Sequence, residues 1–353
     1  MEDFKPMTFL DCGAPSIYNE YARSKKPKSG AYMGSAFKDR KDDNHEYVKS
    51  EFFQNYLKDY IALCKKLPKN DSLVISSLDV INNAEETLKI WLIMKNEGID
   101  AIPAWHLGED ESFLDNYVNK YKVPYLGLGG MTPNPARTLY KPLNRIWKKY
   151  LCNEDGSPKI KVHGFAMTSF NLMFKYPFYS VDSTSANAVA RFGGIFVPKR
   201  NDVSKCPINF PISFKKEKIA NKNHFNHRSK QEQEMILKWI EKFGLSFGKN
   251  ELVDSKEEGD YNFDNEKTQY VKVIEKGVSN SCYERWAYCA QYFKNIQLSV
   301  EKSPIIFNAG STVKQMVPRF FCHNRLLSFY CLRKDMVTRK ELFMRLKKME
   351  EQE

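Results

Sequence analysis

The sequence predicts an α/β protein, a (β/α)8 TIM-type barrel with a C-terminal helical extension. Short apolar runs alternate with segments of helical periodicity up to about residue 198, which is typical of βα units and a parallel sheet. Three of these runs end in an aspartate: Asp11, Asp79 and Asp182. In a parallel architecture the carboxyl ends of the strands meet on one face, where ligands bind. A doubly wound open sheet is the alternative fold.

Seven apolar runs are predicted to be strands, and they are short, rich in β-branched or aromatic residues, and bounded by turn residues. They are Met7–Leu10, Leu73–Leu78, Ala101–His106, Pro124–Leu128, Lys161–Phe165, Phe178–Val181 and Gly194–Pro198. The eighth strand of a barrel has no clear candidate, although Lys218–Ala220 is one.

Between the strands, apolar residues at helical spacing predict helices. The segments are Glu46–Lys66, Ala84–Glu97, Glu111–Lys120, Asn134–Tyr150, Ser169–Lys175 and Ser185–Arg191. Pro135 suits the first turn of its helix, because a proline there loses no hydrogen bond. Gln231–Phe243 is amphipathic and is a candidate for closing the barrel.

From residue 251 the pattern becomes helical only, which divides the chain into a barrel domain, 1–250, and a helical C-terminal region, 251–353. Helices are expected at Tyr270–Val273, Tyr283–Ile296 and Asp335–Glu350. The last is basic and amphipathic. It is either a contact for a phosphate backbone or, the favoured interpretation, a surface helix that packs its apolar side.

Composition favours a nucleic-acid partner and a reduced, cytosolic location. The 353 residues carry a formal net charge of +12, which favours an anionic partner. The absence of an apolar run of about 18 residues predicts no membrane span, and the first residues do not resemble a signal peptide. The eight cysteines are scattered. The basic stretch Arg23–Asn44 is either a phosphate-contacting or lid loop or a solvated insertion.

The three aspartates are the candidates for chemistry. One aspartate alone is usually a helix cap or a turn residue, but three in one βα series favour a site. One carboxylate can attack a sugar C1′ and form a glycosyl-enzyme, and a second can act as acid and base. A third can bind the amide and amine edge of a guanine-type base. The pair Gly129-Gly130 allows backbone N–H groups to approach a planar ligand, or simply makes a tight turn.

The order of several short motifs resembles the tRNA-guanine transglycosylase superfamily. The motifs are Leu10–Ala14, Asp79 after its strand, Leu128–Met131, His163–Phe170 and Tyr179–Thr184. The chain looks closest to the divergent phage branch, which is similar to enzymes that exchange guanine in DNA for a 7-deazaguanine. The resemblance extends over about residues 5 to 250.

This resemblance implies roles for individual residues. Asp182 matches the nucleophile, Asp11 the general acid and base, and Asp79 the carboxylate that recognises the purine edge. Gly129 and Gly130 match backbone that contacts the base.

Three further positions belong to the expected substrate site. His106 stands where the family usually has a glutamine, and its role is therefore open. His163 and Phe165 either line the pocket and stack on the base or fill the core beneath the strand end.

The resemblance also implies the partners. They are DNA, with tRNA as the alternative acceptor, and a free 7-deazaguanine base such as 7-cyano-7-deazaguanine. No membrane partner is expected, a homodimer is left open, and a phage-encoded chain would act in the host cytoplasm. The exchange needs no redox cofactor and no ATP, because one N-glycosidic bond replaces another.

Zinc is not favoured as a cofactor. The tRNA enzymes hold zinc with three closely spaced cysteines and a histidine, and the nearest set here, Cys282, Cys289, Cys322 and His323, has a different spacing. A non-catalytic nucleic-acid-binding barrel is the alternative from another functional class. Three anions in its pocket would repel a phosphate backbone, which favours the enzyme.

Overall fold

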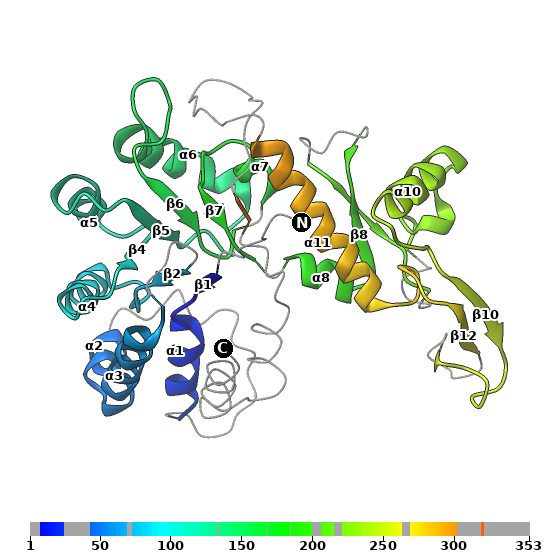
Figure 1. The fold of residues 1–353 in the computed structure, drawn as a ribbon, viewed down its shortest axis with the longest axis horizontal. Helices are drawn as coiled ribbons and strands as arrows, with labels where there is room; N and C mark the ends of the chain where they lie inside the picture. Colours follow the sequence, from blue (N-terminus) through cyan, green and yellow to red (C-terminus); the bar gives the residue numbers. More distant parts are fainter. Residues whose placement is uncertain are drawn as a thin grey trace.

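The protein is a mixed α/β protein whose central strands are parallel (Figure 1). The computed structural model describes residues 8–24, 43–68, 73–132, 134–167, 169–183, 185–199, 206–214, 221–262, 269–301 and 319–320. All statements about the structure concern these ranges. Parallel strands and covering helices confirm the predicted α/β class.

The parallel strands follow one another in chain order. Strands β1 (Thr8–Leu10), β2 (Leu73–Ser76) and β3 (Ala101–Ile102) form one sheet; β4 (Ala104–His106), β5 (Tyr125–Gly129), β6 (Lys161–Gly164) and β7 (Ser180–Val181) continue in a second. Pro103 alone separates β3 from β4, and its carbonyl accepts a hydrogen bond from the Gly127 N–H at 2.8 Å. The two sheets are therefore joined through one nearly continuous strand.

The parallel sheet is strongly curved. Four steps from strand to strand lead from β1 to β6, through β2, β3/β4 and β5. In a flat sheet with ~4.8 Å between neighbouring strands, these steps would separate β1 from β6 by about 19 Å. Yet the rings of Phe9 on β1 and His163 on β6 stack with centroids 4.3 Å apart. In the described part of the chain β1 pairs only with β2, so the curved sheet does not close into a ring there.

Apart from α1 (Ala14–Ser24), where no helix was expected, the helices between the strands lie close to their predicted positions, and Figure 1 shows several of them along the outer side of the strands. Asn83 caps one of them by accepting the Glu86 N–H at 3.1 Å, and Asp110 caps another through the Ser112 N–H at 2.8 Å. Their bounds are α1 (Ala14–Ser24), α2 (Asp43–Lys49), α3 (Glu51–Lys66), α4 (Ala84–Asn96), α5 (Glu111–Asp115) with η1 (Asn116–Lys120), α6 (Ala136–Ile146) with η2 (Trp147–Leu151), α7 (Phe170–Met173) and α8 (Ser185–Arg191).

The seventh predicted strand does not join the parallel sheet. Residues Gly194–Val197 form β8, which pairs antiparallel with β9 (Ile208–Pro211). The two-residue strand β13 (Arg319–Phe320) instead pairs parallel with β7. Placing 194–198 in the parallel series was wrong because an apolar run identifies a strand without identifying its partner. The candidate eighth strand, 218–220, lies outside the described residues.

The expectation of helices only after residue 250 is also wrong. Three strands, β10 (Lys249–Val253), β11 (Tyr261–Asn262) and β12 (Tyr270–Glu275), form an antiparallel sheet in the order β10-β12-β11. Residues 270–273 belong to β12, because their β-branched and aromatic side chains favour a pleated strand over a helix. The helix expected at 335–350 lies outside the described residues, and the domain division at 250 stays a prediction.

Two helices and a short turn of 3-10 helix complete the described elements. They are η4 (Phe225–His227), α10 (Lys230–Lys242) and α11 (Cys282–Glu301). The last two confirm the helices expected at 231–243 and 283–296. A capping box at Ser229 and Glu232 begins α10.

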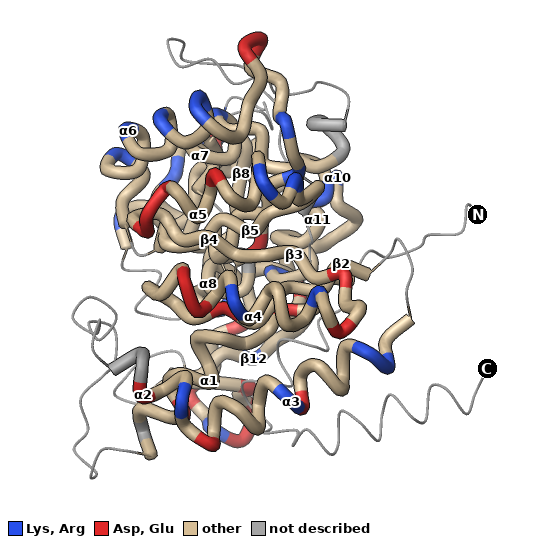
Figure 2. Tube along the Cα trace, turned by 90° about the vertical axis from the view of Figure 1, so that its left-hand side faces the viewer, with Lys and Arg blue, Asp and Glu red and all other residues tan. Residues whose placement is uncertain are grey.

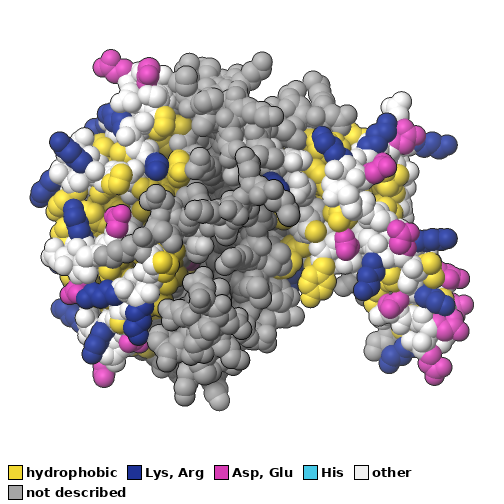
Figure 3. All heavy atoms as spheres, in the orientation of Figure 1, with side chains coloured by type: hydrophobic (Ala, Val, Ile, Leu, Met, Phe, Trp, Pro, Cys, Tyr) yellow, Lys and Arg dark blue, Asp and Glu magenta, His cyan; other side chains and the backbone are white. Residues whose placement is uncertain are grey.

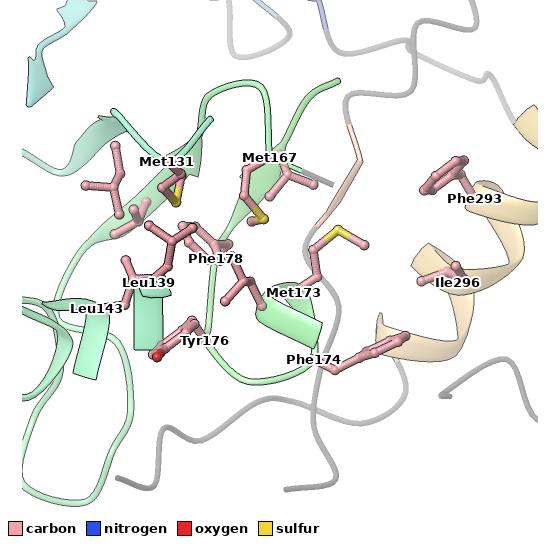
Figure 4. Packing of buried hydrophobic residues seen from close by; sticks show 14 of the residues in the cluster. Met131, Leu139, Leu143, Met167, Met173, Phe174, Tyr176, Phe178, Phe293 and Ile296 are labelled. Atoms are coloured by element: carbon pink, nitrogen blue, oxygen red, sulfur yellow. The ribbon is translucent and has the colours of Figure 1, made fainter. Parts of the chain in front are cut away.

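The main hydrophobic core joins the parallel strands to α11. Figure 4 shows Met173 and Phe174 near Phe293 and Ile296 of α11, and all four are buried in this core. A second buried cluster packs α1, α3 and α4 against β2. The candidate site described below therefore rests on strands that are packed from both clusters.

The surface carries basic residues on one helical segment. The segment formed by α6 and η2 has no acidic residue, and its basic residues are Arg137, Lys141, Arg145, Lys148 and Lys149. Figure 2 shows basic positions along α6, and Figure 3 shows acidic and basic side chains interspersed elsewhere on the visible face. Of the helices that the structure describes, none combines the length and apolar character needed to cross a membrane.

Candidate active site

The predicted site residues gather at the carboxyl edge of the parallel strands. Asp11 directly follows β1, Asp79 comes three residues after β2 ends, and Asp182 directly follows β7. The remaining predicted positions are His106 at the end of β4, Gly129 and Gly130 at the end of β5, His163 within β6, and Phe165 just after it. Since the strands are parallel, consecutive βα units bring these residues together.

The carboxyl group of Asp11 has a raised pKa. Its environment removes water and raises its pKa to about 6; the Gly13 N–H, 3.2 Å from Oδ1, opposes this shift, and the charges of Asp182 and Asp79 add to it. The residue also keeps an exposed face, where solvent screens part of the effect. A carboxyl group with a pKa near 6 can both donate and accept a proton close to neutral pH.

Asp79 is held from two sides. Its Oδ1 accepts the thiol of Cys12 at 3.1 Å, and its Oδ2 lies 3.1 Å from Nε2 of His106. The other ring nitrogen of His106, Nδ1, is 3.4 Å from Oε1 of Glu109. The backbone N–H of His106 donates to Oε2 of the same glutamate. The Asp79 loop is itself fixed, because the Val80 N–H donates to Thr87 Oγ1 at 2.9 Å.

His106 carries a positive charge at neutral pH. Burial lowers the pKa of the imidazole, but the carboxylates of Asp79 and Glu109 beside its two nitrogens outweigh it and raise the pKa to about 10. The imidazolium thus neutralises part of the charge of two buried carboxylates. Because its ring nitrogens face Asp79 and Glu109, His106 acts on a bound ligand through Asp79 rather than through its own N–H groups.

Asp182 is tied to the loop that follows β6. Its Oδ1 accepts the Ala166 N–H at 2.8 Å and lies 3.3 Å from Nε2 of His163, while its side chain stays 24% exposed. Ala166 adopts a left-handed conformation with φ of 49°, which is unfavourable for alanine. Its carbonyl accepts from Thr132 Oγ1 at 2.9 Å. The loops after β5, β6 and β7 are therefore connected around Asp182.

The glycine pair and Phe165 have packing functions. A Cβ at Gly129 would lie 2.4 Å from Cδ2 of His106, and one at Gly130 would lie 2.8 Å from the Leu107 nitrogen. Gly130 also has a φ of +74°. Phe165 packs edge-on against His163, whose ring is fully buried. In this structure His163 is therefore part of the core beneath the site and does not line an open surface.

The possible zinc ligands are only partly described. Cys282 is exposed and Cys289 is buried on α11, whereas Cys322 and His323 lie outside the described residues. Among the described residues no three metal-ligating side chains converge, and none of the six cysteines there forms a disulfide bond.

Several residues at the site were not expected from the sequence. They are Cys12 and Glu109, which contact the Asp79–His106 pair, the Ala166 N–H, and Ser180 with Tyr125 beside His163. Ser180 begins β7 and Asp182 directly follows this strand two residues later, so period-two alternation continued by one residue places both on the same side and was a usable signal. Contacts between different strands have no comparable signature.

The site and fold define a class: an α/β protein with a carboxylate-rich site at the carboxyl edge of a curved parallel sheet. Comparisons with protein-family models, curated proteins and solved structures find no match to this chain.

Proposed function

We propose that this protein is a guanine transglycosylase that exchanges guanine in DNA for a 7-deazaguanine base such as 7-cyano-7-deazaguanine. The observation that supports it most is the pairing of two unlike carboxylates. Asp182 is partly exposed and bonded to the Ala166 N–H, which favours its ionised form. Asp11 interacts electrostatically with Asp182 and has a pKa of about 6. Asp182 therefore suits a nucleophile, and Asp11 suits a general acid and base.

In the first step a carboxylate oxygen of Asp182 attacks C1′ of the target nucleotide. A C1′–O ester bond forms, the C1′–N9 bond breaks, and its electron pair leaves with guanine. Protonated Asp11 gives its proton to the departing base, so guanine leaves neutral and Asp11 becomes a carboxylate.

In the second step Asp11 accepts the N9 proton of the incoming 7-deazaguanine. The N9 electron pair attacks C1′, the ester bond breaks, and Asp182 returns to its carboxylate form. Asp11 is again protonated. The two steps balance without an oxidant, a reductant or ATP, because one N-glycosidic bond replaces another.

Asp79 suits recognition of the base. A carboxylate accepts from the N1–H and exocyclic amine of a guanine-type base, and Oδ2 of Asp79 lies 3.1 Å from Nε2 of His106, which holds the side chain in place. The side chain is only 10% exposed, so bonds made there would be protected from water.

The proposed acceptor is DNA, with tRNA as the alternative. The net charge of +12 and the acid-free basic segment α6–η2 suit a phosphate backbone. A paired guanine must leave the stack, at a cost of a few kcal/mol, before Asp182 can reach its C1′. We also propose that the curved sheet belongs to an eight-stranded barrel, which the Phe9–His163 contact across the sheet supports.

The test is exchange of labelled 7-cyano-7-deazaguanine into single-stranded DNA, duplex DNA and tRNA, followed by nucleoside mass spectrometry. Wild type should label DNA and form a DNA–protein adduct that survives denaturation, and Asp182→Ala should do neither. Asp100→Asn, at an exposed position outside the site, is the control and should retain activity. Labelling of tRNA alone would move the acceptor to RNA. Salt-sensitive binding without labelling of any acceptor would overturn the proposal in favour of a binding protein.

A further inference from the structure

We infer that His163 is a positioning residue for Asp182, held as its Nε2–H tautomer by Ser180 and Tyr125. The catalytic role of His163 rests on the proposed function, whereas the assignment of its tautomer does not. It assigns roles to Ser180 and Tyr125, and it gives His163 a function other than contact with the base.

The four side chains form a continuous chain of polar contacts. The Tyr125 hydroxyl is hydrogen-bonded to Ser180 Oγ, which lies 2.6 Å from Nδ1 of His163. On the other side of the imidazole, Nε2 is 3.3 Å from Oδ1 of Asp182. Tyr125, Ser180 and His163 are buried, and only Asp182 reaches the surface.

The sheet register creates this arrangement. Strands β6 and β7 are parallel neighbours, with His163 opposite Ser180 and Gly164 opposite Val181. Ser180 and Asp182 are two residues apart, so they lie on the same side of the chain. One imidazole can therefore contact Ser180 through one nitrogen and Asp182 through the other.

The direction of the hydrogen bonds follows from Tyr125. Ser180 Oγ is the hydrogen-bond partner of the Tyr125 hydroxyl among the described residues, so the direction that leaves no buried donor unpaired runs from the Tyr125 hydroxyl to Ser180 Oγ. Ser180 then directs its single proton to Nδ1 of His163, which must accept. A neutral imidazole that accepts at Nδ1 carries its proton on Nε2, where it faces the Asp182 carboxylate.

Packing holds the imidazole in place. The ring of Phe9 stacks on His163 with an interplanar angle of 21°, and Phe165 contacts it edge-on with centroids 4.7 Å apart. A ring covered in this way cannot turn its nitrogens away from Ser180 and Asp182 without moving its neighbours.

The consequence for Asp182 is a fixed carboxylate plane. The Ala166 N–H donates to Oδ1 from the loop, and His163 Nε2 lies 3.3 Å from the same oxygen on the core side. The Ala166 hydrogen bond and the imidazole beside it restrict where Oδ2 points, and the hydrogen bond favours the ionised form that a nucleophile requires. The contact between His163 Nε2 and Oδ1 is not a hydrogen bond in this structure, and we expect the Nε2–H to Oδ1 hydrogen bond to form when substrate binds.

The decisive experiment is 15N NMR of the histidine side chains in the full-length protein at neutral pH. His163→Gln assigns the signal, and wild type should show the Nε2–H pattern. Ser180→Ala removes the partner of Nδ1 and should convert this pattern into a tautomer mixture. Tyr125→Phe should cause a smaller change in the same direction. Tyr176→Phe, which loses a buried hydroxyl bonded to Asn144 outside this chain of contacts, should leave the His163 signal unchanged.

A second readout connects the tautomer to catalysis. Ser180→Ala should slow formation of the DNA–protein adduct by about 2- to 10-fold, the factor expected from losing one hydrogen bond between neutral groups. An Nδ1–H signal in wild type, or an unchanged signal in Ser180→Ala, would overturn the inference. If wild type shows the Nε2–H pattern but exchanges no base, the proposed function fails and the structural assignment stands.

Discussion

Nε2 of His106 lies 3.1 Å from Oδ2 of Asp79, and each of these side chains is only 10% exposed. Glu109 approaches the opposite ring nitrogen, so the imidazolium is enclosed by two carboxylates. Such a buried group stabilises the fold only while it is charged, because either carboxylate would otherwise be left without its counter-ion. This relationship makes stability depend on pH.

Stability should fall as the pH rises from about 6.5 to about 10. The pKa of His106 is higher in the folded state than in the unfolded state. The charged imidazole therefore contributes its full stabilisation below the unfolded-state pKa of about 6.5, and this stabilisation is lost as the pH rises through the folded-state pKa of about 10. Urea unfolding across this range should show the loss in wild type and a flatter profile in His106→Gln. His227→Gln, at an exposed histidine, should follow wild type. If the stability of His106→Gln and of wild type changed with pH in the same way, the conclusion that the imidazole is charged would be wrong.

Asp11→Asn should stabilise the protein near neutral pH and not in acid. The folded-state pKa of Asp11 is raised from 3.8 to about 6, so wild type loses stability as the pH rises through this interval. An amide avoids that loss and can still accept the Gly13 N–H. The urea midpoint of Asp11→Asn should exceed that of wild type at about pH 7 and approach it at about pH 4. If the urea midpoints of the variant and wild type differed by the same amount at both pH values, the pKa of Asp11 would not be raised.

Arg285→Met should destabilise the protein by about 2–3 kcal/mol. Arg285 is buried, and its Nε and Nη1 donate to the carbonyls of Ala190 and Val278, each at 2.8 Å. Ala190 lies in the last turn of α8, where carbonyls lack helical partners and favour a cation.

The comparison variant for Arg285 is Arg145→Met. Arg145 pairs with Glu111 on the surface, and its side chain is 66% exposed. This change should stay within about 1 kcal/mol. Urea unfolding measures both variants, and equal effects would mean that burial of Arg285 contributes nothing.

Gly130→Ala should cost more than Gly98→Ala, although the two glycines have nearly the same backbone conformation. Their φ values are +74° and +76°, so each alanine meets left-handed strain of about 1 kcal/mol. A Cβ at Gly98 meets nothing within 4 Å, whereas one at Gly130 lies 2.8 Å from the Leu107 nitrogen. The difference in unfolding free energy should be about 1–3 kcal/mol. Equal values would exclude a steric role for Gly130.

Helix positions were predictable because caps and periodicity are local. Asn83 and Gly98 mark the two ends of α4, and the segment 111–120 is helical throughout as α5 and η1. Strand partners were less predictable. The run 194–197 forms a strand as expected but pairs with β9, and 270–273 is a strand where a helix was expected. Partner choice depends on residues far away in the chain, which periodicity does not record.

The sequence by itself determined the α/β class, most helices, and the three aspartates at strand ends, because all of these follow from local patterns along the chain. Only the tertiary structure decided what surrounds each aspartate. Asp79 meets Cys12 and His106, Asp11 keeps its proton to a higher pH, and Asp182 lies beside a buried His163. The reason is that proton affinity and hydrogen bonding depend on distance in space and on the water excluded by packing.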